Sequence, residues 1–278
     1  MRIIVTGATS QIGLFLLPKF VEQGDQVFAL SRESHESKQI EWLQGDLSDP
    51  DKIELPQADV LIHIGSLSLL PGIWEQISTC GIKRIIAFSS TSVFTKMNTS
   101  NEPERNMIES LKKAESSLMS DCQLHGIAWT LFRPTLIYGA GLDKNVEFIR
   151  SMILKYGFFP IVGDGAGLRQ PVHAGDLAKA CLLALANPAS ENRAYSLSGA
   201  EVLSYRVMVE RIFLASGRKP RILSFPVFLV EWAVVLLRLL PRYRYLNSAM
   251  ISRMQLNMAF SHKDATEDFG YSPRPFQP

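Results

Sequence analysis

Near its start the chain carries the stretch Val5-Thr-Gly-Ala-Thr-Ser-Gln-Ile-Gly13, a turn rich in small residues. It directly follows residues 1–5, a short apolar run with β-branched side chains that predicts a buried strand. It leads into Leu14-Phe-Leu-Leu17, which begins a helical apolar pattern. Backbone N–H groups in the turn and the partial positive charge of the helix N-terminus both favour an anion. The stretch therefore predicts a phosphate cradle between a strand and a helix.

The small residues of this turn have separate roles. Gly7 would allow the sharp turn, and Gly13 would let the helix pack closely on the strand. Ser10 stands where a glycine would bring a pyrophosphate closest, so its hydroxyl either hydrogen-bonds a phosphate oxygen or loosens the fit. The strand–turn–helix context favours dinucleotide binding over an ordinary βα turn that uses glycine for conformation only.

Size and composition indicate a soluble globular protein with one large core, or a core and a smaller lobe, in 278 residues. The net charge of +2 is too small to attract nucleic acid or an anionic membrane through the overall charge of the protein. Three widely spaced cysteines show neither metal-ligand spacing nor a disulfide framework. We therefore expect no resident metal, no nucleic-acid partner and a cytoplasmic setting, and the first apolar run is too short for a signal peptide.

The second strand bears on the choice of dinucleotide. A helix predicted over residues 11–23, with Pro18 inside it, is followed by a strand over residues 26–31, and this βαβ unit fits a parallel sheet. An acidic residue at the tip of that strand would hold the ribose of NAD, whereas an arginine accommodates the 2′-phosphate of NADP. Arg32 follows the strand, so the sequence favours NADP over NAD; the alternative is a solvated arginine with NAD accepted anyway.

Further strands are predicted over residues 40–43, 58–63, 83–88 and 127–132, with a long helix over residues 104–125. Asp46, after the third strand, either accepts a hydrogen bond from an adenine or caps a short turn. His63 fits a packed strand-end histidine better than a catalytic one. Hydroxyl side chains crowd the end of the fifth strand, from Ser89 to Ser92, where open α/β sheets bind ligands.

Taken together, these motifs resemble the extended short-chain dehydrogenase/reductases, also called the NAD-dependent epimerase/dehydratase family. The resemblance spans nearly the whole chain and rests on the turn at residues 6–13, Gly45-Asp-Leu47, Phe88-Ser-Ser90, Arg133-Pro134 with Tyr138-Gly139, and Gly163-Asp-Gly165 running to Arg169-Gln-Pro-Val-His173-Ala-Gly-Asp176. It implies a Rossmann-type doubly wound parallel sheet with a smaller, mostly helical C-terminal substrate lobe. We expect residues 1–138 and 171–200 to form the dinucleotide-binding domain and residues 139–170 and 201–278 the lobe.

The resemblance also implies roles for individual residues. The pyrophosphate would be held by the turn residues Gly7, Thr9, Ser10, Gln11, Ile12 and Gly13. The rest of the cofactor would contact Asp46, Leu47, Ile64, Gly65, Ser89 and Pro134, besides Arg32, which is predicted from its place after the second strand. Ser90, with Thr91 beside it, would bind the substrate oxygen as the catalytic hydroxyl.

Three further residues are expected to contact the substrate: Tyr138, Asn145 and Arg169. Arg169 falls where epimerases of the family place an arginine on a nucleotide-sugar diphosphate, a use that suits a planar, bidentate donor. Asn145 has the alternative of an ordinary polar residue in the first turn of a helix.

The chain departs from the family at the proton donor. The family uses a tyrosine on the long helix, with a lysine four residues later that lowers the pKa of the tyrosine. This chain has no tyrosine before Tyr138, and alignment on Glu115 puts Met107 and Leu111 at the two positions. Lys112 and Lys113 are close but cannot replace a tyrosine, so the sequence predicts an atypical member.

Residues 225–240 are apolar nearly all round and are bracketed by prolines, too short for the ~20 residues that cross a bilayer. We expect a helix there that lies in the core or at a dimer surface; the basic and aromatic run up to residue 245 leaves peripheral membrane contact as the alternative. Family analogy favours a homodimer.

Two functions from different classes follow. The first is an NAD(P)-dependent epimerase, dehydratase or reductase acting by hydride transfer on a nucleotide sugar or related small carbonyl compound. The second is a catalytically degenerate NAD(P)-binding protein that serves as a redox sensor or assembly subunit. A membrane-peripheral reductase is a third, weaker reading drawn from the apolar segment.

Overall fold

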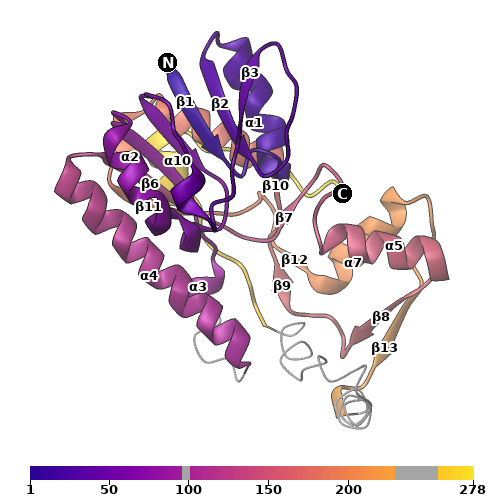
Figure 1. Ribbon diagram of the computed structural model, residues 1–278. Helices are drawn as coiled ribbons and strands as arrows, with labels where there is room; N and C mark the ends of the chain where they lie inside the picture. The colour runs from indigo at the N-terminus through magenta and orange to yellow at the C-terminus, as the bar shows by residue number, and fades with distance from the viewer. Residues whose placement is uncertain (96–100, 229–255) are drawn as a thin grey trace.

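The computed structural model describes residues 1–95, 101–228 and 256–278. Its centre is a seven-stranded sheet in the order β11-β6-β5-β4-β1-β2-β3 (Figure 1). All neighbours pair in parallel, as the predicted doubly wound architecture requires. The strands are β1 (Arg2–Thr6), β2 (Gln26–Ser31), β3 (Ile40–Gln44), β4 (Val60–His63), β5 (Arg84–Phe88), β6 (Ala128–Pro134) and β11 (Arg193–Leu197).

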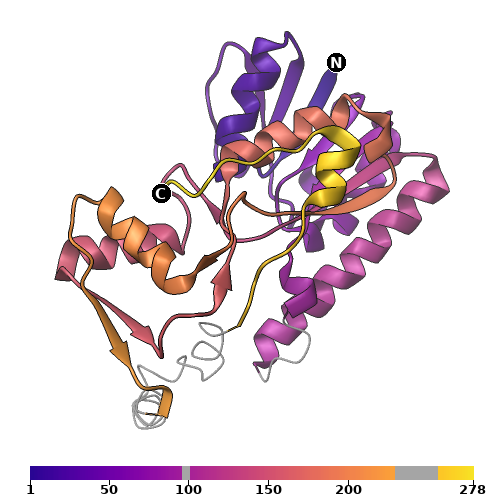
Figure 2. The same ribbon diagram turned by 180° about the vertical axis from the view of Figure 1, so that it is seen from behind.

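Helices cover both faces of this sheet (Figures 1 and 2). Alternate side chains of each strand point to opposite faces, so Ile3 packs in one core and Ile4 in the other. The first core contains α1 (Gln11–Glu22), α6 (Ala174–Leu185) and α10 (Lys263–Phe269). The second contains η2 (Leu67–Ile73), α2 (Trp74–Thr79) and α4 (Glu102–His125). Short elements join them: η1 (Pro50–Lys52), α3 (Ser92–Thr95) and η3 (Pro188–Ser190).

A second lobe stands beside the sheet (Figure 1). It has its own core between α5 (Val146–Tyr156) and α7 (Tyr205–Ala215), and each helix is followed by one strand of a parallel pair, β8 (Phe159–Val162) and β13 (Ile222–Phe225). Two short pairs link the lobes: β7 (Ile137–Tyr138) with β10 (Val172–His173), and β9 (Leu168–Arg169) with β12 (Leu203–Ser204).

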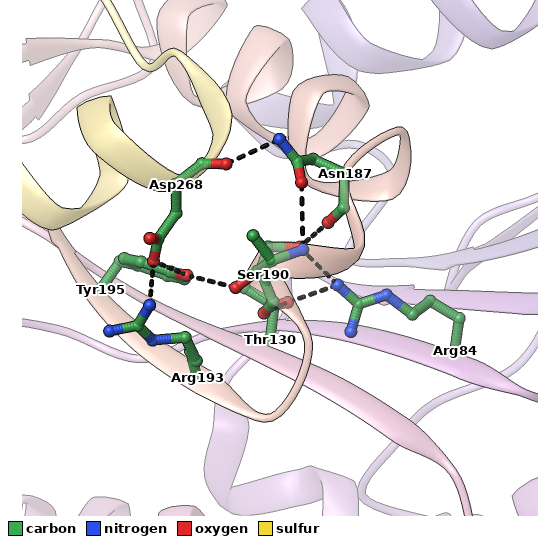
Figure 3. Close-up of polar contacts among 8 residues, drawn as sticks. Arg84, Thr130, Asn187, Ser190, Arg193, Tyr195 and Asp268 are labelled. Atoms are coloured by element: carbon green, nitrogen blue, oxygen red, sulfur yellow. Dashed lines mark hydrogen bonds and ion pairs between the residues drawn. The ribbon is translucent and has the colours of Figure 1, made fainter.

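The C-terminal segment differs from the expected division, which put residues 201–278 in the second lobe. Ala265 and Phe269 lie four residues apart on one side of α10, and both are buried in the core of the sheet with Tyr271. Polar contacts fix the same helix, because the Asp268 carboxylate accepts hydrogen bonds from Arg193 and from the hydroxyl of Tyr195 on β11 (Figure 3). Residues 263–271 therefore pack with the dinucleotide-binding domain; the rest of the division stays a proposal.

The prediction of a helix over residues 225–240 is wrong at residue 225. Phe225 is the last residue of β13, where its carbonyl accepts a hydrogen bond from the backbone N–H of Gly163. Residues 229–240 of the predicted helix, and the basic run up to residue 245, lie outside the described residues. No helix in the described part of the chain is long and apolar enough to cross a membrane.

Candidate active site

The turn after β1 lies at the carboxyl end of the sheet, where β1 pairs with β2 on one side and with β4 on the other. This is the point at which the strand order reverses. Open α/β sheets bind ligands in the crevice at such a point. The predicted phosphate cradle thus has the position that a dinucleotide site requires.

Two glycines of the cradle are needed by the backbone itself. Gly7 has a positive φ of 70°, and a Cβ there would lie 2.5 Å from the backbone nitrogen of Gly65. A Cβ on Gly13 would lie 1.9 Å from the carbonyl oxygen of Ala8. Any larger residue at either position would push α1 or β4 away, so the glycines keep the turn closed against both elements.

The start of α1 presents groups that fit a pyrophosphate. Ser10 is the N-cap, and its hydroxyl accepts a hydrogen bond from the backbone N–H of Gly13 at 3.3 Å. Gln11 and Ile12 are the first two helical residues, so no preceding helical turn supplies acceptors for their N–H groups. The buried Oε1 of Gln11 has no hydrogen-bond partner among the described residues. Thr9 is exposed at the crest of the turn.

The expected adenosine contacts gather at the ends of β2 and β3. One Asp46 carboxylate oxygen accepts hydrogen bonds from the backbone N–H and the hydroxyl of Ser48; these bonds, and the Arg32 charge to a smaller extent, lower the pKa of Asp46. Asp46 therefore caps its turn, one of the two roles expected for it. Leu47 lies beside the cradle, because a Cβ on Gly65 would be 3.3 Å from a methyl group of Leu47.

His63 lies inside the fold, below this crevice. Its Nδ1 is 2.7 Å from the hydroxyl of Thr6, and its Nε2 is 3.0 Å from the carbonyl of Ser66. Burial lowers the pKa of His63 to about 4, which keeps the ring neutral at physiological pH. The ring therefore ties the ends of β1 and β4 together, and its interpretation as a packed histidine is confirmed.

Two of the hydroxyl groups in the serine-rich turn after β5 form hydrogen bonds within the protein. Ser89 donates to the carboxylate of buried Glu115, which also forms a two-point ion pair with Arg133. Thr91 donates from both its hydroxyl and its backbone N–H to the carbonyl of buried Pro134. These contacts brace the turn.

Beside this turn, a cavity of about 620 Å³ lies between the two lobes, within the size range of ligand pockets. Five of the residues expected at a site line it: Gln11, Ser90, Thr91, Asn145 and Arg169. The Ser90 hydroxyl lies 3.1 Å from that of Ser92, which also lines the cavity. The cradle, the serine turn and the second lobe thus meet at one cavity.

Arg169 faces this cavity while being only 6% exposed. Its Nη1 donates to the carbonyls of Leu168 and Leu256, both at 2.7 Å, and its guanidinium lies over the ring of Tyr205 at 5.3 Å. Burial raises the pKa of Tyr205 to about 12, and the nearby Arg169 charge works in the opposite direction. Tyr205 also lines the cavity.

The sequence gives no signal for this tyrosine. Tyr205 is 36 residues beyond Arg169, and only the antiparallel pairing of Leu203 with Arg169 brings the two together. Asp143 was missed as well: one of its carboxylate oxygens accepts hydrogen bonds from the first backbone N–H groups of α5, so Asp143, rather than neighbouring Asn145, caps that helix.

Tyr138, expected to contact substrate, is placed elsewhere. Its ring is 2% exposed in the core of the second lobe, and its hydroxyl accepts a hydrogen bond from the backbone N–H of Gln277. It does not line the cavity. The C-terminal segment covers this tyrosine, a contact over 139 positions that no local pattern predicts.

Across the described ranges, no cluster of three or more histidine, cysteine or carboxylate side chains is arranged to hold a metal ion. The polar groups that the described residues present to the cavity are hydroxyls, amides, one phenol, the carboxylate of Asp143 and two cations, Arg169 and Lys144. Such groups polarise oxygens and transfer protons.

Comparison with solved structures supports this architecture. UDP-glucose 4-epimerase from Thermotoga maritima, solved with UDP-glucose, superposes with a TM-score of 0.75 over 98% of this chain and 94% of its own, at 17% identity. The dTDP-glucose 4,6-dehydratase DesIV from Streptomyces venezuelae, solved with NAD, gives a TM-score of 0.75 over 99% and 93%, at 16% identity. At these identities the likeness shows the fold.

Comparison of sequences adds a relative and a family. A 2-alkyl-3-oxoalkanoate reductase from Stenotrophomonas maltophilia is 24% identical over 99% of this chain and 95% of its own length. The model of the NAD dependent epimerase/dehydratase family matches residues 3–72 and 70–198, a span that contains the cradle, the serine turn and Arg169. The chain therefore belongs to the NAD dependent epimerase/dehydratase family.

Proposed function

We propose that this protein transfers a hydride between NADP(H) and the carbonyl or alcohol carbon of a small molecule bound in the cavity between the lobes. One observation carries the proposal: Gln11 of the cradle and Ser90 of the serine turn line the same cavity. The nicotinamide of the bound cofactor would supply or accept the hydride. Membership of the family and similarity to a reductase over nearly the whole chain support this class of reaction.

Ser90 is the proposed catalytic hydroxyl. It lines the cavity, and it would donate a hydrogen bond to the substrate oxygen as negative charge develops there. Thr91 positions it, because both of its donors are committed to the carbonyl of Pro134. The bond from Ser89 to Glu115 fixes the preceding residue in the same way.

We further propose Tyr205 as the proton donor. In the direction of reduction, hydride addition breaks the carbonyl π bond, and the electron pair left on oxygen takes the phenolic proton. Arg169, whose guanidinium lies 5.3 Å from the ring centroid, would stabilise the phenolate that remains until solvent returns a proton. This pair would take the place of the tyrosine and lysine that the family carries on its long helix.

Arg32 supports the preference for NADP over NAD. It is exposed directly after β2, and its positive charge contributes, as the smallest of the causes, to lowering the pKa of Asp46 after β3. A 2′-phosphate held at this edge would gain the charge-assisted hydrogen bonds of an arginine. The solved neighbour DesIV holds NAD, so the preference needs a direct test.

The substrate proposed from Arg169 is a nucleotide sugar or a related anionic carbonyl compound. The nucleotide sugars bound by the solved neighbours support the first of these. The lack of the tyrosine–lysine pair favours the second candidate function, an NAD(P)-binding protein without turnover. A homodimer, and peripheral membrane contact through residues 225–245, also remain proposals.

Calorimetric titration with NADPH, NADP⁺, NADH and NAD⁺ tests the cofactor, with Arg32→Ala as the variant. We expect NADP(H) to bind more tightly, and the variant to lose at least tenfold in that affinity while binding NAD(H) as before. Cofactor turnover, followed by its absorbance over a panel of carbonyl compounds, separates an enzyme from a sensor. Tyr205→Phe should then lower kcat at least tenfold and leave the Kd for NADPH unchanged; an unchanged kcat would remove Tyr205 as the donor.

A further inference from the structure

We propose that the substrate carries a hydrocarbon chain, which lies along an apolar wall of the cavity. The inference rests on the proposed function and narrows its substrate class to amphiphilic oxo or hydroxy acids. The wall consists of Leu142, Phe148, Ile149, Met208, Met258 and Phe260.

The wall runs from the buried interior to the cavity mouth. Ile149 on α5 and Met208 on α7 are 3% and 0% exposed and form its inner part. Leu142 and Phe148 form its outer part, and each is 56% exposed. Apolar side chains therefore line the cavity both at its buried floor and at its exposed rim.

Exposed large apolar side chains that border a pocket indicate a ligand that covers them. A hydrocarbon chain would displace water from both its own surface and the wall, the main source of affinity for apolar contacts. A sugar placed there would instead lose hydrogen bonds to water, because aliphatic side chains offer no donors or acceptors in return.

The remaining lining suits a charged, oxygen-bearing head group. Ser90, Thr91 and Ser92 bring hydroxyls from the serine turn. Among the described lining residues, Arg169 and Lys144 carry positive charge and Asp143 carries the carboxylate, which accepts hydrogen bonds from the first N–H groups of α5. If the carboxylate of the substrate bound near these cations, the oxygen that reacts would lie beside the serine turn. The hydrocarbon chain of the substrate would then lie on the apolar wall.

A homologous series of 3-hydroxyalkanoates, from four to ten carbons, tests the inference by calorimetry at saturating NADP⁺, with UDP-glucose as the competing class. We expect the Kd to fall about fourfold for each added methylene group until the wall is covered, the factor that burial of one CH₂ corresponds to. A Kd that does not change with chain length, or UDP-glucose binding more tightly than the longest acid, would overturn it.

Two variants test whether the hydrocarbon chain of the ligand contacts the apolar wall. Phe148→Asp should weaken binding of the ten-carbon acid at least tenfold and change that of the four-carbon acid less than twofold. Leu154→Asp is the matched control, since Leu154 is 52% exposed on the same helix but does not line the cavity, and it should change neither Kd. Equal losses in both variants would also overturn the inference.

The same titrations separate this inference from the proposed function. Binding that strengthens with chain length, without reduction of NADP⁺, would refute hydride transfer and keep the wall as a ligand site. If the protein turned over UDP-glucose, and the Kd of the acids did not depend on their chain length, the proposal of hydride transfer would stand. The proposal that a hydrocarbon chain binds on the apolar wall would be refuted.

Discussion

Protonation of His63 should destabilise the fold in acid by an amount that the structure allows us to work out. The ring is fully buried, with one nitrogen at the hydroxyl of Thr6 and the other at the carbonyl of Ser66. Burial lowers the pKa of His63 from 6.5 to about 4. Between these two values the unfolded chain binds a proton at this site and the folded chain does not.

The sign and the size follow from proton linkage. Wherever the unfolded state binds more protons, the free energy of unfolding rises with pH, so it falls as pH decreases from about 6.5 to about 4. Each unit of pKa difference corresponds to about 1.4 kcal/mol, so the His63 contribution lost across this window is about 3 kcal/mol. Above the window the contribution is complete, and below it no further change comes from this ring.

Urea denaturation of the wild type and of His63→Gln, at half-unit steps from pH 7.5 to 4, measures this loss. The glutamine does not titrate, and its amide can donate to the Ser66 carbonyl. We subtract the unfolding free energy of the variant from that of the wild type at each pH. This value should be about 3 kcal/mol lower at pH 4 than at pH 7. Other titrating groups act on both proteins, so they cancel in the difference.

Parallel pH profiles for the two proteins would refute the reasoning, whatever their absolute stabilities. If the variant does not fold, an NMR titration of the wild-type histidine rings gives the same answer directly. One ring, hydrogen-bonded to Thr6, should stay neutral down to about pH 4. A His63 midpoint near 6.5 in the folded protein would show that the buried position carries no penalty.

Three further substitutions test the frame of the site. Gly13→Ala puts a Cβ 1.9 Å from a turn carbonyl, so cofactor affinity should drop at least tenfold and stability by about 1–3 kcal/mol, measured by calorimetry and urea unfolding. Glu115→Ala leaves the largely buried Arg133 guanidinium without its carboxylate, which should cost about 3 kcal/mol; a loss below 1 kcal/mol would contradict the brace. Arg274→Ala deprives the buried Asp176 carboxylate of its ion pair, so stability should fall by about 1–3 kcal/mol and the C-terminal segment should be proteolysed faster; unchanged cleavage would argue against that anchor.

The sequence predicts the sheet and its cradle because their determinants are local. The strand predicted over residues 26–31 has those bounds in the structure, since an apolar run flanked by a glycine turn and polar residues leaves little choice. Ser204 caps α7 through the backbone N–H of Val207, as its position before the apolar pattern suggests. Gly7 and Gly13 belong to one short motif that the sequence displays directly after β1, although the close approach that Gly7 permits is with the distant Gly65.

What the sequence does not predict depends on contacts between distant segments. Tyr205 reaches the cavity through a strand pairing with residues 168–169, and Tyr138 is removed from it by the last residues of the chain. Both outcomes depend on which distant segments of the chain pack together. The spacing of apolar residues within one segment does not predict which other segment it will contact. The core position of α10 has the same origin, because seven residues with two apolar side chains give a weak local signal.

The long helix α4 supports the proposal that the proton donor comes from another element. Leu111, which the alignment on Glu115 predicts at one of the two family positions, packs against the core below the sheet, and Met107, predicted at the other, is 53% exposed. None of the described residues of α4 lines the cavity, whereas α7 places Tyr205 there beside a buried arginine. A phenol and a cation thus line the same cavity as the serine turn, and neither comes from α4. If the chemistry has moved with them, activity will depend on how the lobes close on each other, and substitutions in the β9–β12 pair should lower kcat while cofactor affinity stays constant.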